Sequence, residues 1–291
     1  MKKLLEGKTL SQKILASLPG RIAGVTAKAG RPPLLAIINY YDDSPSGIYV
    51  KRKIAACGKL GLDIRLLKPD NKEDLPGFLN ILGSLKDDDA VDAVMIERPL
   101  PGGFEIPAVW DAIPEGKDVD ALSSLNMGRL FISKTQDIEH AGFFVPCTAL
   151  AVVRLLQYHN IAVAGKKIAV AGRSAVVGRP LAHMLTSLDA TVTICHTKTQ
   201  DISGLFKTSD IIVTAAGKAR WITAEMVAPG ATVIDIGTNM DVNGLMCGDA
   251  DFEGMKDKVL AMTPVPGGVG PVTLACLIEA VVKAAENRIK N

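Results

Sequence analysis

The sequence predicts an α/β protein of two domains, the second of which is a Rossmann-like doubly wound parallel sheet. Short apolar runs alternate with longer helix-like segments along the whole chain, which is typical of a parallel sheet covered by helices on both faces. The 291 residues hold one large domain or two medium ones, and 48% hydrophobic content is enough for a full core. In the second half, a glycine-containing turn joins a predicted strand to a predicted helix, as nucleotide-binding sheets require.

The predicted strands are short apolar runs that are rich in branched residues and bounded by polar or turn-forming residues. Those of the second half are numerous enough for a nucleotide-binding sheet of the doubly wound type. In chain order, the predicted strands are Leu34–Asn39, Asp63–Leu67, Ala93–Ile96, Lys167–Ala171, Thr191–Cys195, Ile211–Ala215, Thr232–Ile236 and Val259–Met262.

The segments between these runs are predicted helices, because their apolar residues recur with a helical period. The polar stretch Asn126–Gly142 is interpreted as the passage between the domains, so we expect one domain at residues 1–147 and the other at 148–271. The last helix could cap either domain. The predicted helices are Leu10–Ala27, Gly47–Leu60, Leu75–Lys86, Ala149–Tyr158, Leu181–Leu188 and Val272–Ile289.

The composition favours small ligands over nucleic acid, because the net charge is only +2 and aromatic residues make up 4% of the chain. The five cysteines are odd in number, widely spaced and without a CxxC pair, so they predict neither a disulfide framework nor a zinc site and fit a reducing cytosol. The apolar run after Met1-Lys2-Lys3 is too short for an export segment, and no 18-residue apolar stretch is present. We therefore expect a cytoplasmic protein without metal, membrane or nucleic-acid partners.

The densest glycine and proline segment is Thr263–Pro271, directly before the last predicted helix. Glycine permits a positive φ and close approach of another molecule, while proline fixes φ and is where cis peptide bonds occur. Such backbone can lie against a flat ligand. For a single Pro-Gly pair, a turn that joins two domains is the competing interpretation.

The predicted strand Lys167–Ala171 continues into the turn Gly172–Pro180 and then into a helix, which is the context of a dinucleotide fingerprint. The second and third glycines of the GxGxxG pattern are replaced by Ser174 and Val177. An ordinary strand-to-helix turn therefore remains an alternative on this motif alone.

Cofactor preference is predicted from the end of the next strand, which reads Cys195–Thr199 and contains no carboxylate. An NAD-selective site places an acid there to bind the ribose 2′-hydroxyl. Arg173 in the glycine turn, with Thr197 and Lys198 opposite, suits a 2′-phosphate instead, so NADP is preferred over NAD. His196 is interpreted as a contact to the adenosine side, and Lys198 could equally be a solvated charge.

The first half contains a candidate reactive group on one predicted helix face. Tyr49 and Lys53 are four residues apart, so an aromatic ring and an amine lie one turn apart on the same side. Glu97 ends a predicted strand, and strand ends line the ligand crevice of an α/β sheet. Asp120 could accept two N–H bonds from an aminopyrimidinone ring. The alternatives are a core tyrosine, a lysine that extends to water and a solvated turn acid.

In this order, the motifs resemble the methylenetetrahydrofolate dehydrogenase/methenyltetrahydrofolate cyclohydrolase family over almost the whole chain. The resemblance implies two domains that face each other across a cleft, helix 272–291 returning to the first domain, and usually a homodimer. It implies NADP-dependent oxidation of 5,10-methylenetetrahydrofolate, then hydrolysis to 10-formyltetrahydrofolate, in one-carbon metabolism and purine biosynthesis. The motifs are Ser46…Tyr49…Lys53, Pro99-Leu100-Pro101, Lys117-Asp118-Val119-Asp120, Pro146-Cys147-Thr148, Gly172-Arg173-Ser174…Val177-Gly178…Pro180 and Thr263–Pro271.

The resemblance also implies residue roles. Tyr49 stacks on the folate, Lys53 is the catalytic amine, Asp120 holds the pterin, and Glu97 belongs to the same catalytic group. The further substrate-binding residues are Ser46, Pro99, Leu100, Pro266, Gly267 and Gly268. The cofactor-binding residues are Thr148, Gly172, Arg173, Ser174, Val177, Gly178, His196, Thr197, Gly217 and Thr238. No metal is implied.

The chain departs from the family pattern around the folate pocket. Glu97-Arg98 stands where Gln-Leu is usual. A carboxylate within about 4–6 Å of Lys53 favours its ammonium form, whereas hydrolysis needs a neutral amine to activate water. We therefore expect a high ratio of dehydrogenase to cyclohydrolase activity, unless Glu97 pairs with Arg98 or Arg52. Further departures are Tyr41, Pro45, Ala121, Ala149 and Leu150.

Two other functions compete with this interpretation. One is an NADP-dependent dehydrogenase of another small substrate, such as a shikimate-type enzyme, which the spacing of Tyr49 and Lys53 and the segment Thr263–Pro271 disfavour. The other is a non-catalytic folate- or nucleotide-binding module, which the presence of Lys53 disfavours.

Overall fold

The computed structural model describes residues 2–41, 45–69, 71–134 and 142–290 and divides into two compact units. The six-stranded unit comprises the described residues of Met1–Gln12, Leu130–His140 and Pro146–Cys276. The three-stranded unit comprises those of Lys13–Arg129, Ala141–Val145 and Leu277–Asn291. The predicted boundaries near residues 147 and 271 stay a prediction. Among the described residues, no helix is long and apolar enough to cross a bilayer.

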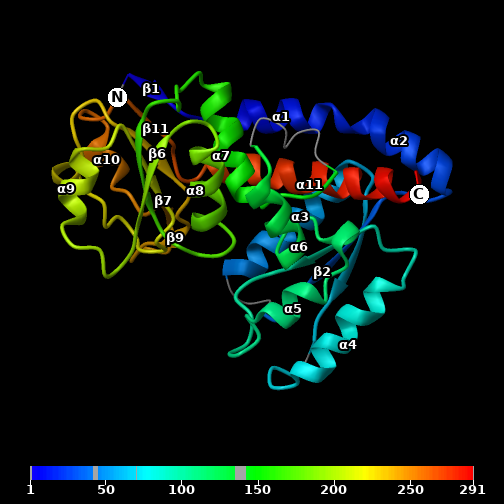
Figure 1. Ribbon diagram of the computed structural model, residues 1–291. Coiled ribbons are helices and arrows are strands. Elements are labelled where there is room, and N and C mark those ends of the chain that lie inside the picture. The colour runs from blue at the N-terminus through cyan, green and yellow to red at the C-terminus, as the bar shows by residue number, and fades with distance from the viewer. Residues whose placement is uncertain (1, 42–44, 70, 135–141, 291) are drawn as a thin grey trace. The chain divides into compact units, whose positions relative to one another are not determined.

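The six-stranded unit is built on a parallel sheet whose strands follow the order β1-β11-β8-β7-β5-β6 among the described residues (Figure 1). Its central strands are mostly apolar, and all their residues except Lys167 at the start of β5 are buried, as expected for a sheet covered on both faces. β5 has β6 on one side and β7 on the other, so the direction of winding reverses between β5 and β7. The strands are β1 (Lys3–Leu4), β5 (Lys167–Ala171), β6 (Thr191–Cys195), β7 (Ile211–Thr214), β8 (Thr232–Asp235) and β11 (Ala261–Met262).

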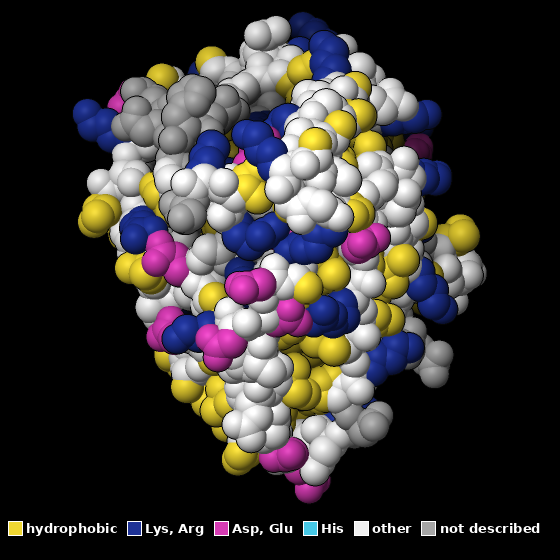
Figure 2. All heavy atoms as spheres, turned by 90° about the vertical axis from the view of Figure 1, so that its right-hand side faces the viewer, with side chains coloured by type: hydrophobic (Ala, Val, Ile, Leu, Met, Phe, Trp, Pro, Cys, Tyr) yellow, Lys and Arg dark blue, Asp and Glu magenta, His cyan; other side chains and the backbone are white. Residues whose placement is uncertain are grey.

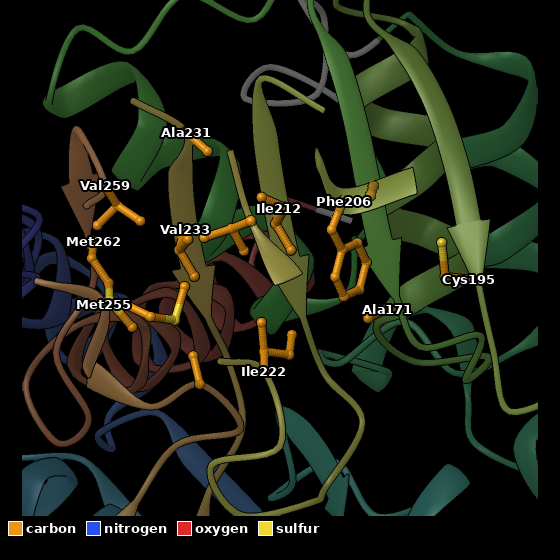
Figure 3. Close-up of a cluster of buried hydrophobic side chains, with 13 residues drawn as sticks. Ala171, Cys195, Phe206, Ile212, Ile222, Ala231, Val233, Met255, Val259 and Met262 are labelled. Carbon is orange, nitrogen blue, oxygen red and sulfur yellow. The ribbon is translucent and has the colours of Figure 1, made fainter. Parts of the chain in front are cut away.

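Helices cover the two faces of this sheet, with α9 and α10 on one side and α7 and α8 on the other (Figure 1). The α9/α10 face is filled by a buried cluster in which Phe206 from α9 and Met255 from α10 pack on Ile212 of β7 and Val233 of β8 (Figure 3). This packing holds the sheet rigid beneath its strand ends. The helices are α7 (Cys147–Tyr158), α8 (Gly178–Thr186), α9 (Ile202–Lys207) and α10 (Phe252–Met255), and a hairpin pairs β9 (Asn239–Met240) with β10 (Met246–Cys247).

The three-stranded unit is built on the parallel sheet β3-β2-β4, in which Ile38 lies opposite Leu67 on one side and Ile96 on the other. Phe78 of α4 packs edge to face on Tyr40, which directly follows the central strand in the core. The strands are β2 (Leu34–Ile38), β3 (Asp63–Leu67) and β4 (Ala93–Ile96). The helices are α2 (Leu18–Ala29), α3 (Pro45–Lys59), α4 (Leu75–Lys86), α5 (Pro107–Asp111) and α6 (Ser124–Ile132).

The C-terminal helix α11 (Val269–Arg288) contributes its last turns to the three-stranded unit. The Arg21 guanidinium donates to both carboxylate oxygens of Glu286, at 2.8 and 2.7 Å. Arg288 donates to Asp92 at 2.6 Å, and the same fully buried carboxylate accepts from Arg31 and from the Leu34 N–H. These contacts fix the end of the chain beside the three-stranded sheet.

Each predicted strand is present, although Val259–Met262 is shortened to Ala261–Met262, and the predictions for one helix and for the passage between the domains need correction. The predicted helix Leu10–Ala27 is two helices, α1 (Lys8–Ala16) and α2, because Pro19 fits only the first turn of a new helix. Asn126–Gly142 was predicted as a polar passage, yet its start belongs to α6; residues 135–141 lie outside the described part of the chain. Strand β1 and the β9/β10 hairpin were not predicted.

On the face drawn in Figure 2, basic and acidic side chains are interspersed among hydrophobic ones, and no broad field of one sign covers it. This mixture agrees with the small net charge of +2.

Candidate functional site

A buried ion pair lies at the centre of the candidate site in the three-stranded unit. Lys53 on α3 donates from Nζ to Glu97 Oε2, and the two side chains are only 13% and 10% exposed. Glu97 directly follows β4 and is held there by its own N–H, which donates to the Ile38 carbonyl at 2.8 Å. The expectation that Glu97 faces Lys53 is therefore met in the structure.

The alternative partners of Glu97 lie elsewhere. Arg52 is placed over the Tyr49 ring, with its guanidinium carbon 5.7 Å from the ring centroid. Tyr49 itself is half-buried, one turn before Lys53 on the same helix. A half-buried ring on an active helix face can stack on a flat ligand while its edge stays packed.

Cys57 lies one turn after Lys53 on α3, in the core of the three-stranded unit. The thiol is fully buried, and burial raises its pKa to about 12 although Lys53 acts in the opposite direction. The thiol is therefore protonated at neutral pH and does not serve as a nucleophile. The lysine amine thus has an apolar neighbour on its own helix and a carboxylate from the sheet.

The segment Lys117–Asp120 separates into structural and candidate binding residues. Lys117 donates from Nζ to three carbonyl groups at and beyond the end of α4, those of Leu85, Lys86 and Asp88, at 2.8, 3.1 and 2.8 Å. Lys117 therefore caps α4, since the last carbonyls of a helix lack partners within it. Burial is the main cause that lowers the Lys117 pKa.

Asp118 has an equally structural role. Its carboxylate is 1% exposed and accepts from the Leu122 N–H, the Ser123 N–H and Asn126 Nδ2, each at 2.9 Å, so it holds the start of α6. Asp120 lies half-buried between this anchor and Ala121. The roles of Lys117 and Asp118 were missed by the sequence interpretation.

Ala121 has an uncommon backbone conformation. Its φ is +53°, in the left-handed region where only glycine carries no steric cost. Pro99 follows a cis peptide bond, and Leu100 is buried. Ser46 is part of α3, but its side chain lies outside the description.

The turn after β5 has the close packing that a nucleotide site needs. A Cβ on Gly172, at φ +143°, would lie 2.6 Å from the Ala215 carbonyl oxygen, and one on Gly178 would lie 2.1 Å from the Gly172 oxygen. Both positions therefore require glycine. Ser174 Oγ accepts from the N–H groups of Val177 and Gly178 at 3.2 and 3.4 Å, so the serine shapes the start of α8.

The end of β6 lies beside this turn, because Ala171 is in register with Cys195 and the Gly172 N–H donates to the Cys195 carbonyl at 3.0 Å. Arg173 and Thr197, both exposed, thus leave adjacent strand ends. His196 Nδ1 accepts from the Lys198 N–H at 3.1 Å, which leaves Nε2 as the protonated nitrogen of the neutral ring.

The remaining predicted cofactor and substrate residues of this unit follow neighbouring strands. Gly217 follows β7 with φ +67°, Thr238 follows β8, and Pro266–Gly268 follow β11. Gly267 has φ +112°, its carbonyl accepts from the Gly7 N–H at 2.9 Å, and the Val265–Pro266 bond is cis. The structure therefore brings these residues to one edge of the sheet. Thr148 lies in the first turn of α7.

Sequence interpretation missed two buried acids at this edge, Asp235 and Asp249. The signal that could have indicated Asp235 is an acid that ends a wholly apolar strand and is followed closely by a glycine.

Comparisons with known proteins cover the full chain. Residues 5–120 match the family model of the tetrahydrofolate dehydrogenase/cyclohydrolase catalytic domain, and residues 146–289 match that of its NAD(P)-binding domain. The bifunctional protein FolD of Elusimicrobium minutum is 44% identical over 287 residues, which are 98% of this chain and 100% of that protein.

Solved structures agree. The bifunctional methylenetetrahydrofolate dehydrogenase/cyclohydrolase of Campylobacter jejuni is 37% identical with a TM-score of 0.89, over 98% of this chain and 99% of that one. The Trypanosoma brucei enzyme, solved with NADP and an inhibitor, is 30% identical with a TM-score of 0.89, over 99% and 98%. A shikimate dehydrogenase from Aquifex aeolicus is 12% identical with a TM-score of 0.52, covering 89% and 97%, which shows likeness of fold alone.

Proposed function

We infer that this chain, which belongs to the tetrahydrofolate dehydrogenase/cyclohydrolase family, oxidises 5,10-methylenetetrahydrofolate with NADP and hydrolyses the methenyl product to 10-formyltetrahydrofolate. The observation that carries this proposal is Lys53, retained within a full-length match and held in a buried pair with Glu97. A shikimate-type enzyme or a non-catalytic binding module accounts for neither the full-length match nor the buried amine.

The six-stranded unit fits NADP. The glycines at 172 and 178 leave space that a Cβ would fill, and the end of β6 has no acid. We propose that Arg173 forks onto the 2′-phosphate, with Thr197 beside it. When bound, NADP accepts a hydride from the folate methylene carbon.

In the three-stranded unit, we propose that Tyr49 stacks on the folate and that Asp120 accepts hydrogen bonds from the pterin. The carbon that loses the hydride is flanked by two nitrogens whose lone pairs stabilise the resulting cation. Oxidation therefore needs near-attack geometry and no strong base. These residues supply that geometry by orienting the substrate.

Hydrolysis makes a different demand. Water must lose a proton as its oxygen bonds to the methenyl carbon; the C–N5 bond then breaks as the hydroxyl proton of the adduct moves to N5, and the carbon stays on N10 as a formyl group. We propose that Lys53 Nζ takes the proton that water loses. Because Nζ is already engaged by the Glu97 carboxylate in a buried ion pair, we propose that hydrolysis is slower than oxidation in this enzyme.

We also propose a cytoplasmic homodimer that supplies one-carbon units for purine biosynthesis. The exposed apolar side chains Met240, Val242 and Leu245 of the β9/β10 hairpin region support self-association, since such side chains are favoured at interfaces. Sedimentation equilibrium tests the dimer, and a monomer at micromolar concentration would contradict it.

One assay tests the proposed activity. The protein is mixed with 5,10-methylenetetrahydrofolate and either NADP or NAD, and reduced cofactor and the methenyl chromophore are followed separately. We expect reduced cofactor to form faster with NADP, with transient accumulation of the methenyl compound. Absence of cofactor reduction with both dinucleotides would reject the dehydrogenase. Reduction of the cofactor without any accumulation of the methenyl compound would reject the proposal that hydrolysis is slower than oxidation.

A further inference from the structure

We propose that Asp249 is a positioning residue of the cofactor site, whose buried carboxylate fixes the loop after β7 at the carboxyl edge of the six-stranded sheet. Asp235 in turn fixes Asp249. The proposal rests on the proposed function in one respect only, which is that this edge receives NADP.

The Asp249 carboxylate is 0% exposed, and both of its oxygens accept several hydrogen bonds. Three of the donors belong to the loop that follows β7, one is the hydroxyl of the last residue of β7, and the fifth comes from β9. Oδ2 accepts from Thr214 Oγ1 at 2.8 Å, the Ala216 N–H at 2.6 Å and the Gly217 N–H at 3.2 Å; Oδ1 accepts from the Lys218 N–H and Asn239 Nδ2, each at 2.9 Å.

Asp235 holds the backbone on which Asp249 stands. It is the last residue of β8, and its Oδ1 accepts from the N–H groups of Gly237 and Asp249 at 2.9 and 3.1 Å. Its Oδ2 accepts from the Ala250 N–H at 2.8 Å. The Asp235 N–H donates to Thr263 Oγ1 at 2.7 Å, at the start of the segment Thr263–Pro271. The network thus joins the ends of β7, β8 and β11.

The chain leaves room for these carboxylates by placing glycines against them. A Cβ on Gly237 would lie 2.3 Å from the Asp249 carboxylate, and one on Gly248 would lie 2.0 Å from Asp235 Oδ2. Each aspartate therefore occupies the space that a side chain at the facing glycine position would need. Each pair thus requires a glycine opposite the aspartate.

Neither carboxylate has a Lys or Arg partner among the residues that the structure describes; neutral N–H and O–H groups surround them. An amide in place of Asp249 would point its NH₂ group at two or more donors, whichever way it turned. The buried N–H groups of the loop would then lose their acceptor.

The loop in question borders the place where a doubly wound sheet binds its ligand. β5 and β7 flank the reversal of winding, and ligands bind outside the carboxyl ends of the strands at such a point. The close approach of Gly172 to Ala215 shows that the loop packs directly against the glycine turn. A loop displaced by loss of Asp249 would therefore alter the shape of the dinucleotide site itself.

The test compares Asp249→Asn with Asp118→Asn, another buried aspartate that accepts three hydrogen bonds but lies in the three-stranded unit. NADP affinity is measured by calorimetry without folate, and hydrogen exchange of the amides at 216–218 is measured in the ligand-free protein. We expect Asp249→Asn to weaken NADP binding about tenfold or more and to speed exchange at these amides. Asp118→Asn should change neither, although it lowers the melting temperature.

Thr214→Val provides a milder variant, in case Asp249→Asn does not fold. It removes one donor to Asp249 while keeping the branched shape in β7, and we expect NADP binding to weaken about three- to fivefold. Thr214→Ser keeps the hydroxyl that Thr214→Val removes, so this variant should bind NADP with about the affinity of the wild type. Unchanged NADP affinity in Thr214→Val, or equal behaviour of the two asparagine variants, would overturn the proposal. If wild-type protein binds no dinucleotide, the proposed function fails, while the exchange rates still test the positioning role.

Discussion

In the three-stranded unit the candidate site consists of ionisable and aromatic side chains, whereas in the six-stranded unit it consists mainly of backbone. Lys53, Glu97 and Tyr49 come from one helix face and one strand end. The carboxyl edge of the six-stranded sheet is instead lined by Gly172, Gly217 and Gly267, which have positive φ. Buried Asp249 holds that backbone in place.

The difference teaches which sequence changes each unit tolerates. In the six-stranded unit, Ser174 and Val177 replace motif glycines without loss of the turn, because Gly172 and Gly178 keep the close contacts. In the three-stranded unit, a change of the Glu97 carboxylate to an amide would remove the charge that pairs with Lys53. A site made of side chains is thus altered by one substitution, whereas a site made of backbone tolerates substitutions that keep the backbone conformation.

The largest effect is expected from Lys53→Met, which keeps the length of the side chain and removes the amine. Hydrolysis of supplied 5,10-methenyltetrahydrofolate should fall about 10²- to 10⁴-fold, the usual contribution of a general base. NADP affinity should not change, because Lys53 belongs to the other unit. Lys51→Met, an exposed lysine of the same helix, is the control. A Lys53→Met enzyme with wild-type hydrolysis would remove Lys53 from the mechanism.

The two units should respond to pH in opposite directions. Burial alone raises the pKa of Asp92, but hydrogen bonds from Arg31, the Leu34 N–H and Arg288 outweigh it and hold the pKa below the ordinary value. The stabilisation from this carboxylate is therefore present above about pH 4 and is lost in acid. Burial raises the pKa of Asp235 to about 7, and the Asp249 charge adds to the rise against three N–H donors. Its contribution is present below about pH 4 and is lost as pH rises through 7.

Chemical unfolding at several pH values checks this contrast. Relative to wild type, Asp235→Asn should flatten the fall in unfolding free energy between about pH 4 and 7, an effect at most on the order of 4 kcal/mol. Asp92→Asn should instead reduce the loss of stability below about pH 4. If the unfolding free energies of the two variants depend on pH in the same way, the opposite pH responses of Asp92 and Asp235 are wrong.

Arg173→Gln should separate the two dinucleotides. A charge-assisted hydrogen bond is worth about 1.5–3 kcal/mol, so NADP binding should weaken about 10- to 150-fold while NAD binding changes little. The control is Arg179→Gln, which changes an exposed arginine at the start of α8, the helix that follows the turn of Arg173. Equal losses for NADP and NAD in calorimetric titrations would mean that Arg173 does not contact the 2′-phosphate.

The smallest effect is expected from Tyr49→Ala. Stacking contributes about 0.5–1.5 kcal/mol beyond the area buried, so the folate KM should rise about two- to twelvefold with NADP affinity intact. Tyr49→Phe keeps the ring and should behave as wild type. If Tyr49→Ala instead lowers the melting temperature strongly and leaves KM unchanged, the ring serves the core.

The strands could be predicted closely because each is a short apolar run, and β3, β4, β5 and β6 have the predicted bounds. Strand β1 could not, because its two residues pair with β11 more than 250 residues away and carry no pattern of their own. Helix α6 was missed because most of it lies in the stretch Asn126–Gly142, which contains glycine and is polar as a whole, while tertiary contacts of Asp118 and Asn126 support the helix.

The same contrast applies to the site. Helix periodicity and the strand end place Lys53 and Glu97 in the candidate site, but they leave the partner of Glu97 open among Lys53, Arg52 and Arg98; the contact with Lys53 comes from the structure. Asp249 could not be predicted, because nothing local shows that five donors from other strands converge on it. The position of a residue can be predicted from sequence where local periodicity fixes it, but not where contacts between distant segments fix it.

The account depends most directly on the charge at position 97. The decisive measurement is the rate of hydrolysis of supplied 5,10-methenyltetrahydrofolate, relative to the rate of NADP reduction, in wild type and in Glu97→Gln. Wild type should oxidise faster than it hydrolyses, and Glu97→Gln should raise hydrolysis several-fold at neutral pH with NADP affinity unchanged, because a neutral amide no longer holds Lys53 Nζ in an ion pair. Equal hydrolysis rates in the two proteins, or a lower rate in Glu97→Gln, would contradict the account.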